Sequence, residues 1–283
     1  MLTDELKDFD DIGKTIQLHG NGLFSKEEVI VSINKTEKSN GIVFVLNNQR
    51  ISCDIGNVSN ATRNIVLSNN IESVCLVEHF LAACSLLNVD GIEVRTNKNE
   101  LIFNDGSALH WHQAFLKSSF TKKSNTQELT LEKYNLPEAL FLKSKDKEIV
   151  AIPHEGFKVS YFMDWDHPVL GKLWASWEKK DGVDKLLRAR SFATKQENDF
   201  FCVSDRLLTL DEKGFNKKLH EPLEPVYHKI LDIVGDLRLC GVNPLDINMH
   251  VIGFKSGHCM NVELAKELIM SLKAGDEAMT LLG

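Results

Sequence analysis

The sequence predicts an α+β protein, because strands followed by helices occur twice along the chain. In the first half, short segments alternate apolar and polar residues as half-buried strands do, and a longer apolar segment follows them. A second series of strands begins near residue 148 and also ends in helices. The stretch 117–126 between the two series is polar, which is typical of a linker. We therefore expect a first α+β domain over residues 1–120 and a second over residues 128–283, with no residue-level repeat between them.

The first half contains four expected strands and two expected helices. The strands cover residues 15–19, 28–33, 41–46 and 91–96, and a glycine turn at 20–22 joins the first two. The apolar segment 71–87 predicts a helix. Ser107 follows an Asp-Gly turn and is expected to cap a second helix that runs through Leu116.

The second half begins with two strands, at residues 148–152 and 157–163, which flank a Pro-His-Glu-Gly turn and predict a β-hairpin. A helix then leads into residues 186–192, whereas residues 193–225 are polar and carry no clear pattern. A helix around His228 and a strand at 248–254 follow. Asn261 is expected to cap the last helix, whose apolar face includes Leu264, Leu268 and Leu272.

Composition and charge exclude several classes of protein. The chain has 283 residues, of which 43% are hydrophobic, so it can bury a sizeable core in one large or two medium domains. Its net charge of −7 comes from 33 basic and 40 acidic residues. A nucleic-acid-binding protein needs a basic surface, so we expect no nucleic-acid partner.

Several features favour a cytoplasmic location. The first eight residues are acidic and lack the apolar region of a secretory signal. The longest apolar run is interrupted at Glu78 and His79, too soon for a transmembrane segment. The six cysteines form no C-x-x-C pair, so neither a disulfide framework nor a cysteine zinc site is expected.

The polar residues of two apolar segments predict a metal site. Glu78 and His79 lie within the apolar stretch 74–84, where packing does not require charge. His228, Asp232 and Asp236 recur every four residues and therefore share one face of a helix. A catalytic zinc ion takes three protein ligands from His, Asp and Glu, and this set can supply them. A carboxylate beside the metal suits a general base.

Each of these signals has a plainer interpretation when taken alone. A His-x-x-x-Asp pair on a helix is more often hydrogen-bonded or exposed than bound to metal, and Glu78-His79 does not begin an HExxH motif. His258 follows a small-residue turn, where a carboxylate such as Asp236 would keep it charged as an acid for a leaving amine. A surface histidine is the alternative. His110 and His112 point apart on a helix and are interpreted as structural.

The candidate residues belong to a series of short motifs along the chain: Val77-Glu78-His79, Asn104-Asp105-Gly106-Ser107-Ala108, Asp166-His167-Pro168, Arg188-Ala189-Arg190-Ser191-Phe192, His228-Lys229-Ile230-Leu231-Asp232 with Gly235-Asp236, and Lys255-Ser256-Gly257-His258. In this order the motifs resemble those of one family, the zinc amidase of lipid A synthesis named UDP-3-O-acyl-N-acetylglucosamine deacetylase, or LpxC. The resemblance covers nearly the whole chain and implies two similar domains, each a β-sheet layered against helices, with the active site between them.

The resemblance also implies a role for each matching residue. The zinc ligands would be His79, His228 and Asp232, a set that also accepts Fe²⁺, and Glu78 would be the base that activates water. His258, held by Asp236, would stabilise charge and protonate the departing amine, and the Ser191 hydroxyl would hydrogen-bond the oxyanion. The implied substrate contacts are Lys229 and Lys255 to polar and phosphate groups, Phe192 to the substrate, and Tyr161 to the uracil.

Two departures from the family pattern concern the substrate. The first glycine motif reads Gly20-Asn21-Gly22-Leu23-Phe24-Ser25-Lys26, which lacks one family histidine and one glycine. The stretch between Ser191 and His228 is shorter than in typical members, where it builds the passage for a fatty-acyl chain, and residues 196–199 and 211–214 are polar here.

We therefore expect a monomeric zinc N-deacetylase whose lipid passage is reduced and whose substrate is a small N-acetylated sugar or nucleotide sugar. The alternatives are the lipid A deacetylase itself and a non-catalytic relative that binds a nucleotide sugar or a metal. A binder needs no acid or base, so the retention of Glu78 and His258 argues against the second alternative.

Overall fold

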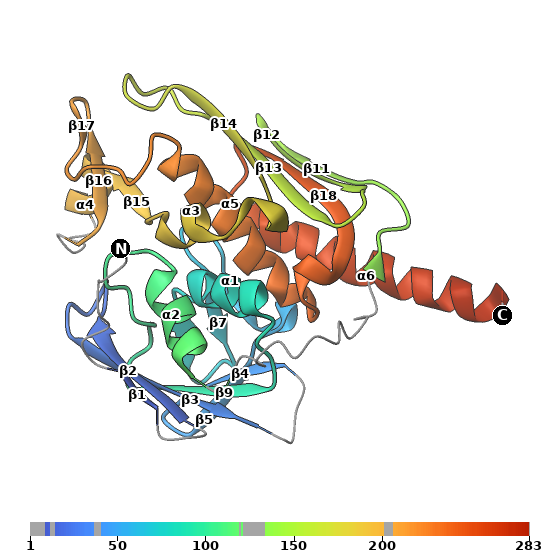
Figure 1. Cartoon of the computed structure of the whole chain (residues 1–283), viewed down its shortest axis with the longest axis horizontal. Helices are drawn as coiled ribbons and strands as arrows, with labels where there is room; N and C mark the ends of the chain where they lie inside the picture. Colours follow the sequence, from blue (N-terminus) through green and yellow to red (C-terminus); the bar gives the residue numbers. More distant parts are fainter. Residues whose placement is uncertain are drawn as a thin grey trace.

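The computed structural model describes residues 9–11, 15–36, 41–118, 120, 134–200 and 206–282. The fold is mixed α+β, as the sequence predicts. Two large sheets lie on opposite sides of the molecule, and helices α1, α2 and α5 lie between them (Figure 1). The predicted linker 117–126 falls mostly outside the described residues, so the domain boundaries at 120 and 128 stay a prediction.

The first sheet confirms the four strands predicted for the first half. It has the strand order β1-β2-β3-β9-β4-β5, and only the β4–β9 pair is parallel. Alternate residues of β3 are buried, as its apolar-polar pattern requires. The strands are β1 (Phe9–Asp11), β2 (Thr15–Asn21), β3 (Glu28–Lys35), β4 (Ile42–Leu46), β5 (Gln49–Ser52) and β9 (Ile92–Thr96).

The second sheet has the order β11-β12-β18-β13-β14, and β10 (Tyr134–Asn135) pairs with β18. The predicted hairpin between β12 and β13 is wrong, because β18 lies between them, antiparallel to β12 and parallel to β13. Asn248 of β18 accepts a hydrogen bond from the Gly156 N–H at 3.1 Å and fixes the turn there. The strands are β11 (Leu140–Ser144), β12 (Lys147–Pro153), β13 (Phe157–Asp164), β14 (Lys172–Glu178) and β18 (Ile247–Phe254).

The helix predicted for residues 71–87 begins late. Strand β8 (Ser73–Cys75) pairs with β7 (Val66–Ser68), which in turn pairs with β6 (Val58–Asn60). Leu76 then has a positive φ of 61°, which a right-handed helix cannot include. Helix α1 therefore covers only Glu78–Leu87, and Glu78 lies at its first position.

Two helix caps differ from their predictions. Helix α2 (Leu109–Lys117) has Ala108 at the N-cap position, although the Ser107 hydroxyl accepts a hydrogen bond from the Leu109 N–H at 3.4 Å. Helix α6 (His258–Leu282) begins three residues before Asn261, so Asn261 is not its cap. The Asn261 side chain instead donates to Asp236 at 2.8 Å.

The unassigned region 193–225 contains regular structure. Strands β15 (Phe192–Thr194), β16 (Leu208–Asp211) and β17 (Gly214–Phe215) form a small sheet beside helix α4 (Lys195–Phe200). The remaining helices are α3 (Asp184–Arg188), α5 (Glu224–Leu237) and the short 3₁₀ helices η1 (Ile55–Asn57), η2 (Lys179–Asp181), η3 (Arg238–Cys240) and η4 (Pro244–Asp246).

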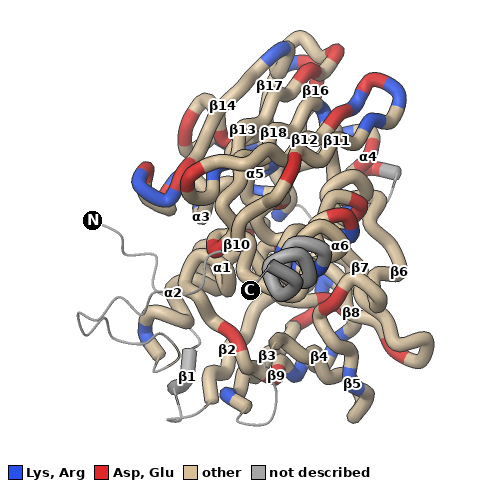
Figure 2. The backbone as a smooth tube through the Cα atoms, turned by 90° about the vertical axis from the view of Figure 1, so that its right-hand side faces the viewer, with Lys and Arg blue, Asp and Glu red and all other residues tan. Residues whose placement is uncertain are grey.

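Each large sheet has its own hydrophobic core, and the two cores meet where α1 packs against α5. Phe44, Phe80 and Trp111 fill the first core, and Trp177 and Leu231 belong to the second. Basic and acidic residues are interspersed over the loops of both parts (Figure 2). Among the described residues, no helix has the length and hydrophobicity that crossing a membrane requires.

Gly235 allows the close approach of α5 to α1, because a Cβ at this position would lie 2.0 Å from the Glu78 carbonyl oxygen. Gly235→Ala should therefore lower the free energy of unfolding by about 1–3 kcal/mol, although alanine is ordinarily the better helix former. Urea unfolding followed by circular dichroism measures this change. Gly257→Ala is the control, since nothing lies within 4 Å of its added Cβ. A more stable Gly235→Ala variant would contradict the proposed packing constraint.

Candidate active site

Helices α1 and α5 bring three predicted ligands together. His79 Nε2 lies 3.3 Å from Asp232 Oδ1, and His228 Nε2 lies 3.4 Å from the same oxygen. One donor atom from each residue lies within 4.8 Å of the others. Two imidazoles and one carboxylate form a donor set of the kind that holds Zn²⁺ and leaves a further coordination position open.

The charges around this cluster suit metal binding. Burial lowers the pKa of His228, which keeps the imidazole neutral. Burial alone would raise the pKa of Asp232, but the positive charges of Lys229 and His258 outweigh it and hold the pKa of that carboxyl well below its usual range. Lys229 Nζ donates to Asp232 Oδ2 at 2.8 Å. A neutral imidazole and an ionised carboxylate are the forms that bind a cation.

Glu78 lies next to His79 at the positive end of the α1 dipole, where a carboxylate is favoured. Its Oε2 accepts a hydrogen bond from the Ile65 N–H at 3.1 Å. Burial raises the pKa of Glu78, although His258 and His79 oppose that rise. A buried carboxylate with a raised pKa is a better proton acceptor than an exposed one.

His258 lies at the start of α6 and faces the end of α5. Its Nδ1 lies 2.8 Å from Asp236 Oδ2, which also accepts a hydrogen bond from Asn261. Burial alone would lower the pKa of His258, but Asp236 and Asp232 outweigh it and raise the pKa to about 10. The two carboxylates therefore favour the charged form of His258. The sequence predicted Asn261 as a helix cap and missed its contact with Asp236, because an asparagine near a helix start suits either role.

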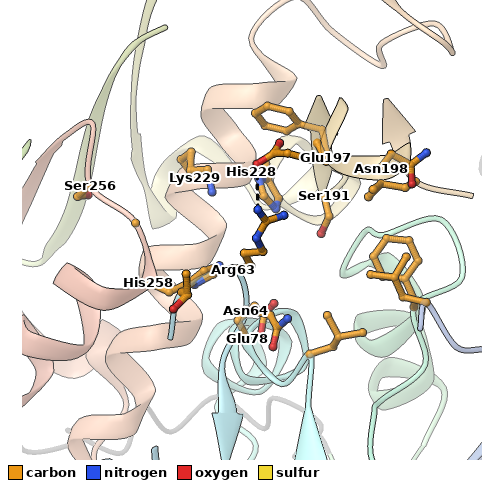
Figure 3. A pocket seen from close by; sticks show the side chains of 18 of the residues that line it. Arg63, Asn64, Glu78, Ser191, Glu197, Asn198, His228, Lys229, Ser256 and His258 are labelled. Atoms are coloured by element: carbon orange, nitrogen blue, oxygen red, sulfur yellow. Dashed lines mark ion pairs between the residues drawn. The ribbon is translucent and has the colours of Figure 1, made fainter. Parts of the chain in front are cut away.

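A cavity of about 380 Å³ opens beside these residues (Figure 3). Glu78, His228, Lys229 and His258 line it, and it lies where the two parts of the fold meet. Polar residues that the sequence did not identify as site residues also line it, namely Thr62, Arg63, Asn64, Glu197 and Asn198. They fall in a turn-rich segment and in a polar helix, so no hydrophobic periodicity marked them.

The predicted substrate residues reach the same cavity. Ser191 donates its hydroxyl to the Gly106 carbonyl at 3.3 Å, and the Phe192 ring packs 5.6 Å from the His228 ring. Lys255 pairs with Asp146 at 2.5 Å. Tyr161 also lines the cavity, but it is only 4% exposed and its hydroxyl donates to the Ser256 carbonyl at 2.5 Å. Tyr161 therefore holds the 255–258 loop in place.

A buried ion pair fixes the segment that carries Ser191. Arg190 Nε donates to Glu224 Oε1 at 2.7 Å, and the Arg190 N–H donates to the same oxygen at 3.2 Å. Glu224 is the first residue of α5, so the pair ties Ser191 and Phe192 to the helix that carries His228. His110 and His112, interpreted as structural, are buried on α2, and neither lines this cavity.

Comparisons with known proteins point to one family. A family model described as "LpxC: UDP-3-O-acyl N-acetylglycosamine deacetylase" matches residues 10–270. The UDP-3-O-acyl-N-acetylglucosamine deacetylase of Trichormus variabilis is 27% identical over 276 residues, which cover 91% of this chain and 97% of the relative. That of Chlamydia trachomatis is 28% identical over 274 residues, with 91% and 93% covered. The matched region includes both large sheets and the whole cluster of His79, His228 and Asp232.

Proposed function

Because this chain belongs to the UDP-3-O-acyl-N-acetylglucosamine deacetylase (LpxC) family, we propose that it is a metal-dependent N-deacetylase of an acetamido sugar nucleotide. The observation that supports this proposal best is the convergence of His79, His228 and Asp232 beside Glu78 and His258 in one cavity. A binding protein needs ligands for a sugar or a metal, but it has no use for a buried base and a buried acid on either side of them.

The proposed metal is Zn²⁺, held by His79, His228 and Asp232, and Fe²⁺ suits the same donors. When bound, it would supply Lewis-acid activation of the acetamide carbonyl and of the attacking water. The protein residues would then move the protons. Glu78 takes a proton from the water as the water oxygen bonds to the carbonyl carbon. His258 gives a proton to the amide nitrogen as the C–N bond breaks. The products are acetate and a free amine.

The other residues of the cavity would orient the substrate and stabilise charge. We assign the Ser191 hydroxyl to the developing oxyanion, since it lies on the cavity wall beside the His228 helix. Lys229 and Lys255 would contact polar and phosphate groups, and Phe192 would contact the substrate, whereas the buried Tyr161 would support the loop that carries Lys255. Asp236 and Asn261 would position His258, because they hold its Nδ1 side and leave Nε2 toward Asp232.

We further propose that the substrate carries a smaller 3-O substituent than a long fatty-acyl chain. A cavity of about 380 Å³ is at the small end for ligand sites, and charged residues lie beside its apolar wall. The second candidate is the 3-O-acylated substrate that the relatives' name states. An apolar cluster beside the cavity favours this second candidate, and it consists of Leu23, Phe103 and Leu207.

Amine release by the zinc-loaded protein distinguishes these substrates. The two probes are UDP-N-acetylglucosamine without a 3-O substituent and the same sugar with a 3-O-dodecanoyl group. We expect the acyl-free sugar to be turned over at least as well as the acylated one. Turnover of the acylated sugar alone would show that the second candidate is right. Absence of amine from either, by protein shown to contain zinc, would contradict the deacetylase proposal for this sugar class.

A further inference from the structure

Residues 61–65 connect β6 to β7 and contact both parts of the molecule around the cavity. The Ile65 N–H donates to Glu78 at 3.1 Å, and the Ala61 carbonyl accepts from the Cys259 thiol at 3.0 Å. In the middle of this segment, Arg63 pairs with Glu197 of α4, with 3.6 Å between Nη2 and Oε1. The segment is therefore fixed at both ends, and the Arg63–Glu197 pair joins it to the α4 side of the cavity.

The Glu197 side chain is oriented by Thr194, the residue before α4. Its Oε2 accepts hydrogen bonds from the Thr194 N–H at 3.0 Å and from the Thr194 hydroxyl at 2.9 Å. The Glu197 N–H donates in return to the Thr194 hydroxyl at 3.2 Å, as in a capping box. The other carboxylate oxygen of Glu197, Oε1, pairs with Arg63.

The ion pair lies at the rim of the cavity, next to its apolar wall. Arg63 and Glu197 both line the cavity, yet their side chains are 50% and 40% exposed. In Figure 3 the dashed line between them crosses the space in front of His228, with His258 on one side and Ser191 and Asn198 on the other. The apolar wall consists of Leu23, Leu76, Phe103, Ala193 and Leu207, which pack together.

We propose that the Arg63–Glu197 ion pair determines substrate specificity by keeping a long 3-O-acyl chain off this apolar wall. This inference rests on the proposed deacetylase function and adds the residues that set the size of the substituent. An acyl chain that reached the wall would have to separate the pair or cover it. Either event removes water from two charges without giving them new partners, which opposes binding.

A merely structural role predicts a different result. An exposed ion pair contributes little to stability, so its loss should leave the unfolding transition nearly unchanged. If the pair determines specificity, its loss should instead change the ratio of kcat/KM for the dodecanoyl sugar to that for the acyl-free sugar. Both quantities can be measured on the same preparations.

The test uses Arg63→Ala and Glu197→Gln, where glutamine keeps an oxygen acceptor for Thr194 but removes the charge. We expect each to raise the dodecanoyl to acyl-free ratio about tenfold, the effect of burying roughly two more methylene groups. The double variant with Arg63→Glu and Glu197→Arg should return toward the wild-type ratio. Lys195→Gln is the matched control, because it removes another exposed ion pair of α4 and Lys195 does not line the cavity.

An unchanged ratio in both single variants would overturn the inference, and so would an equal change in Lys195→Gln. The inference would also be wrong if the wild type preferred the dodecanoyl sugar and the variants lost this preference. The ion pair would then help to bind the acyl chain. If no variant releases amine, the deacetylase proposal fails by itself. Titration of each protein with the two sugars, followed by intrinsic tryptophan fluorescence, then gives the affinities, because Trp165 lies in the cavity wall. These affinities decide the inference by the same tenfold criterion.

Discussion

Replacing Glu78 with glutamine should lower kcat by about 10²- to 10⁴-fold, the usual contribution of a general base. Glutamine has nearly the same shape, and its side-chain oxygen can still accept the hydrogen bond from the Ile65 N–H. It cannot take a proton from water. Because Glu78 is not one of the three proposed ligands, His79, His228 and Asp232, the metal content should not change. Steady-state amine release and elemental analysis of the same preparation measure the two quantities.

The control for this variant is Glu72→Gln. Glu72 belongs to the same part of the fold and accepts a hydrogen bond from Asn47 at 2.9 Å, which glutamine can keep. Its kcat should stay at the wild-type value. If Glu78→Gln kept kcat within tenfold of the wild type, another group would have to be the base. A loss of zinc together with activity would instead mean that Glu78 supports the metal site.

Local sequence patterns predicted the strands in which buried and exposed residues alternate. The alternation in residues 28–33 and 157–163 matches the buried and exposed faces of β3 and β13. Errors arose where a distant segment decides the structure. Strand β18 separates β12 from β13, although the sequence between those two strands is a good hairpin turn. The start of α1 depends on β8 pairing with β7 and on the positive φ of Leu76, and neither is visible in local hydrophobicity.

The same distinction holds for the candidate site. Polar residues in apolar helices predicted that His79 would meet His228 and Asp232, because burying them without partners would be costly. Arg63 and Glu197 have no such signal, since both are partly exposed and lie in polar segments. Tyr161 illustrates a further limit. The family resemblance implied that its ring contacts the uracil, but only the structure shows that its hydroxyl fixes the Ser256 loop.

Asp232→Asn should raise the dissociation constant for zinc by more than about 100-fold and remove activity with it. Substitution of a residue that only hydrogen-bonds a metal ligand typically weakens metal binding about 10–100-fold. Loss of a charged ligand itself should weaken it more. Asp232 is also the residue that both histidines approach, at 3.3 and 3.4 Å. Asparagine would leave them with a neutral partner and would leave Lys229 without the charge that balances it. Competition with a chromophoric chelator measures the affinity.

A second readout of the same variant does not depend on catalysis. Zinc that binds only the folded protein raises the melting temperature, and this rise should be present in the wild type and absent in Asp232→Asn. Asp236→Asn is the matched control, because Asp236 lies one turn further along α5 and contacts His258 rather than the two histidines. It should keep the zinc-dependent rise while activity falls, since His258 loses the carboxylate that holds it charged. Equal zinc binding by Asp232→Asn and the wild type would remove Asp232 from the proposed ligand set.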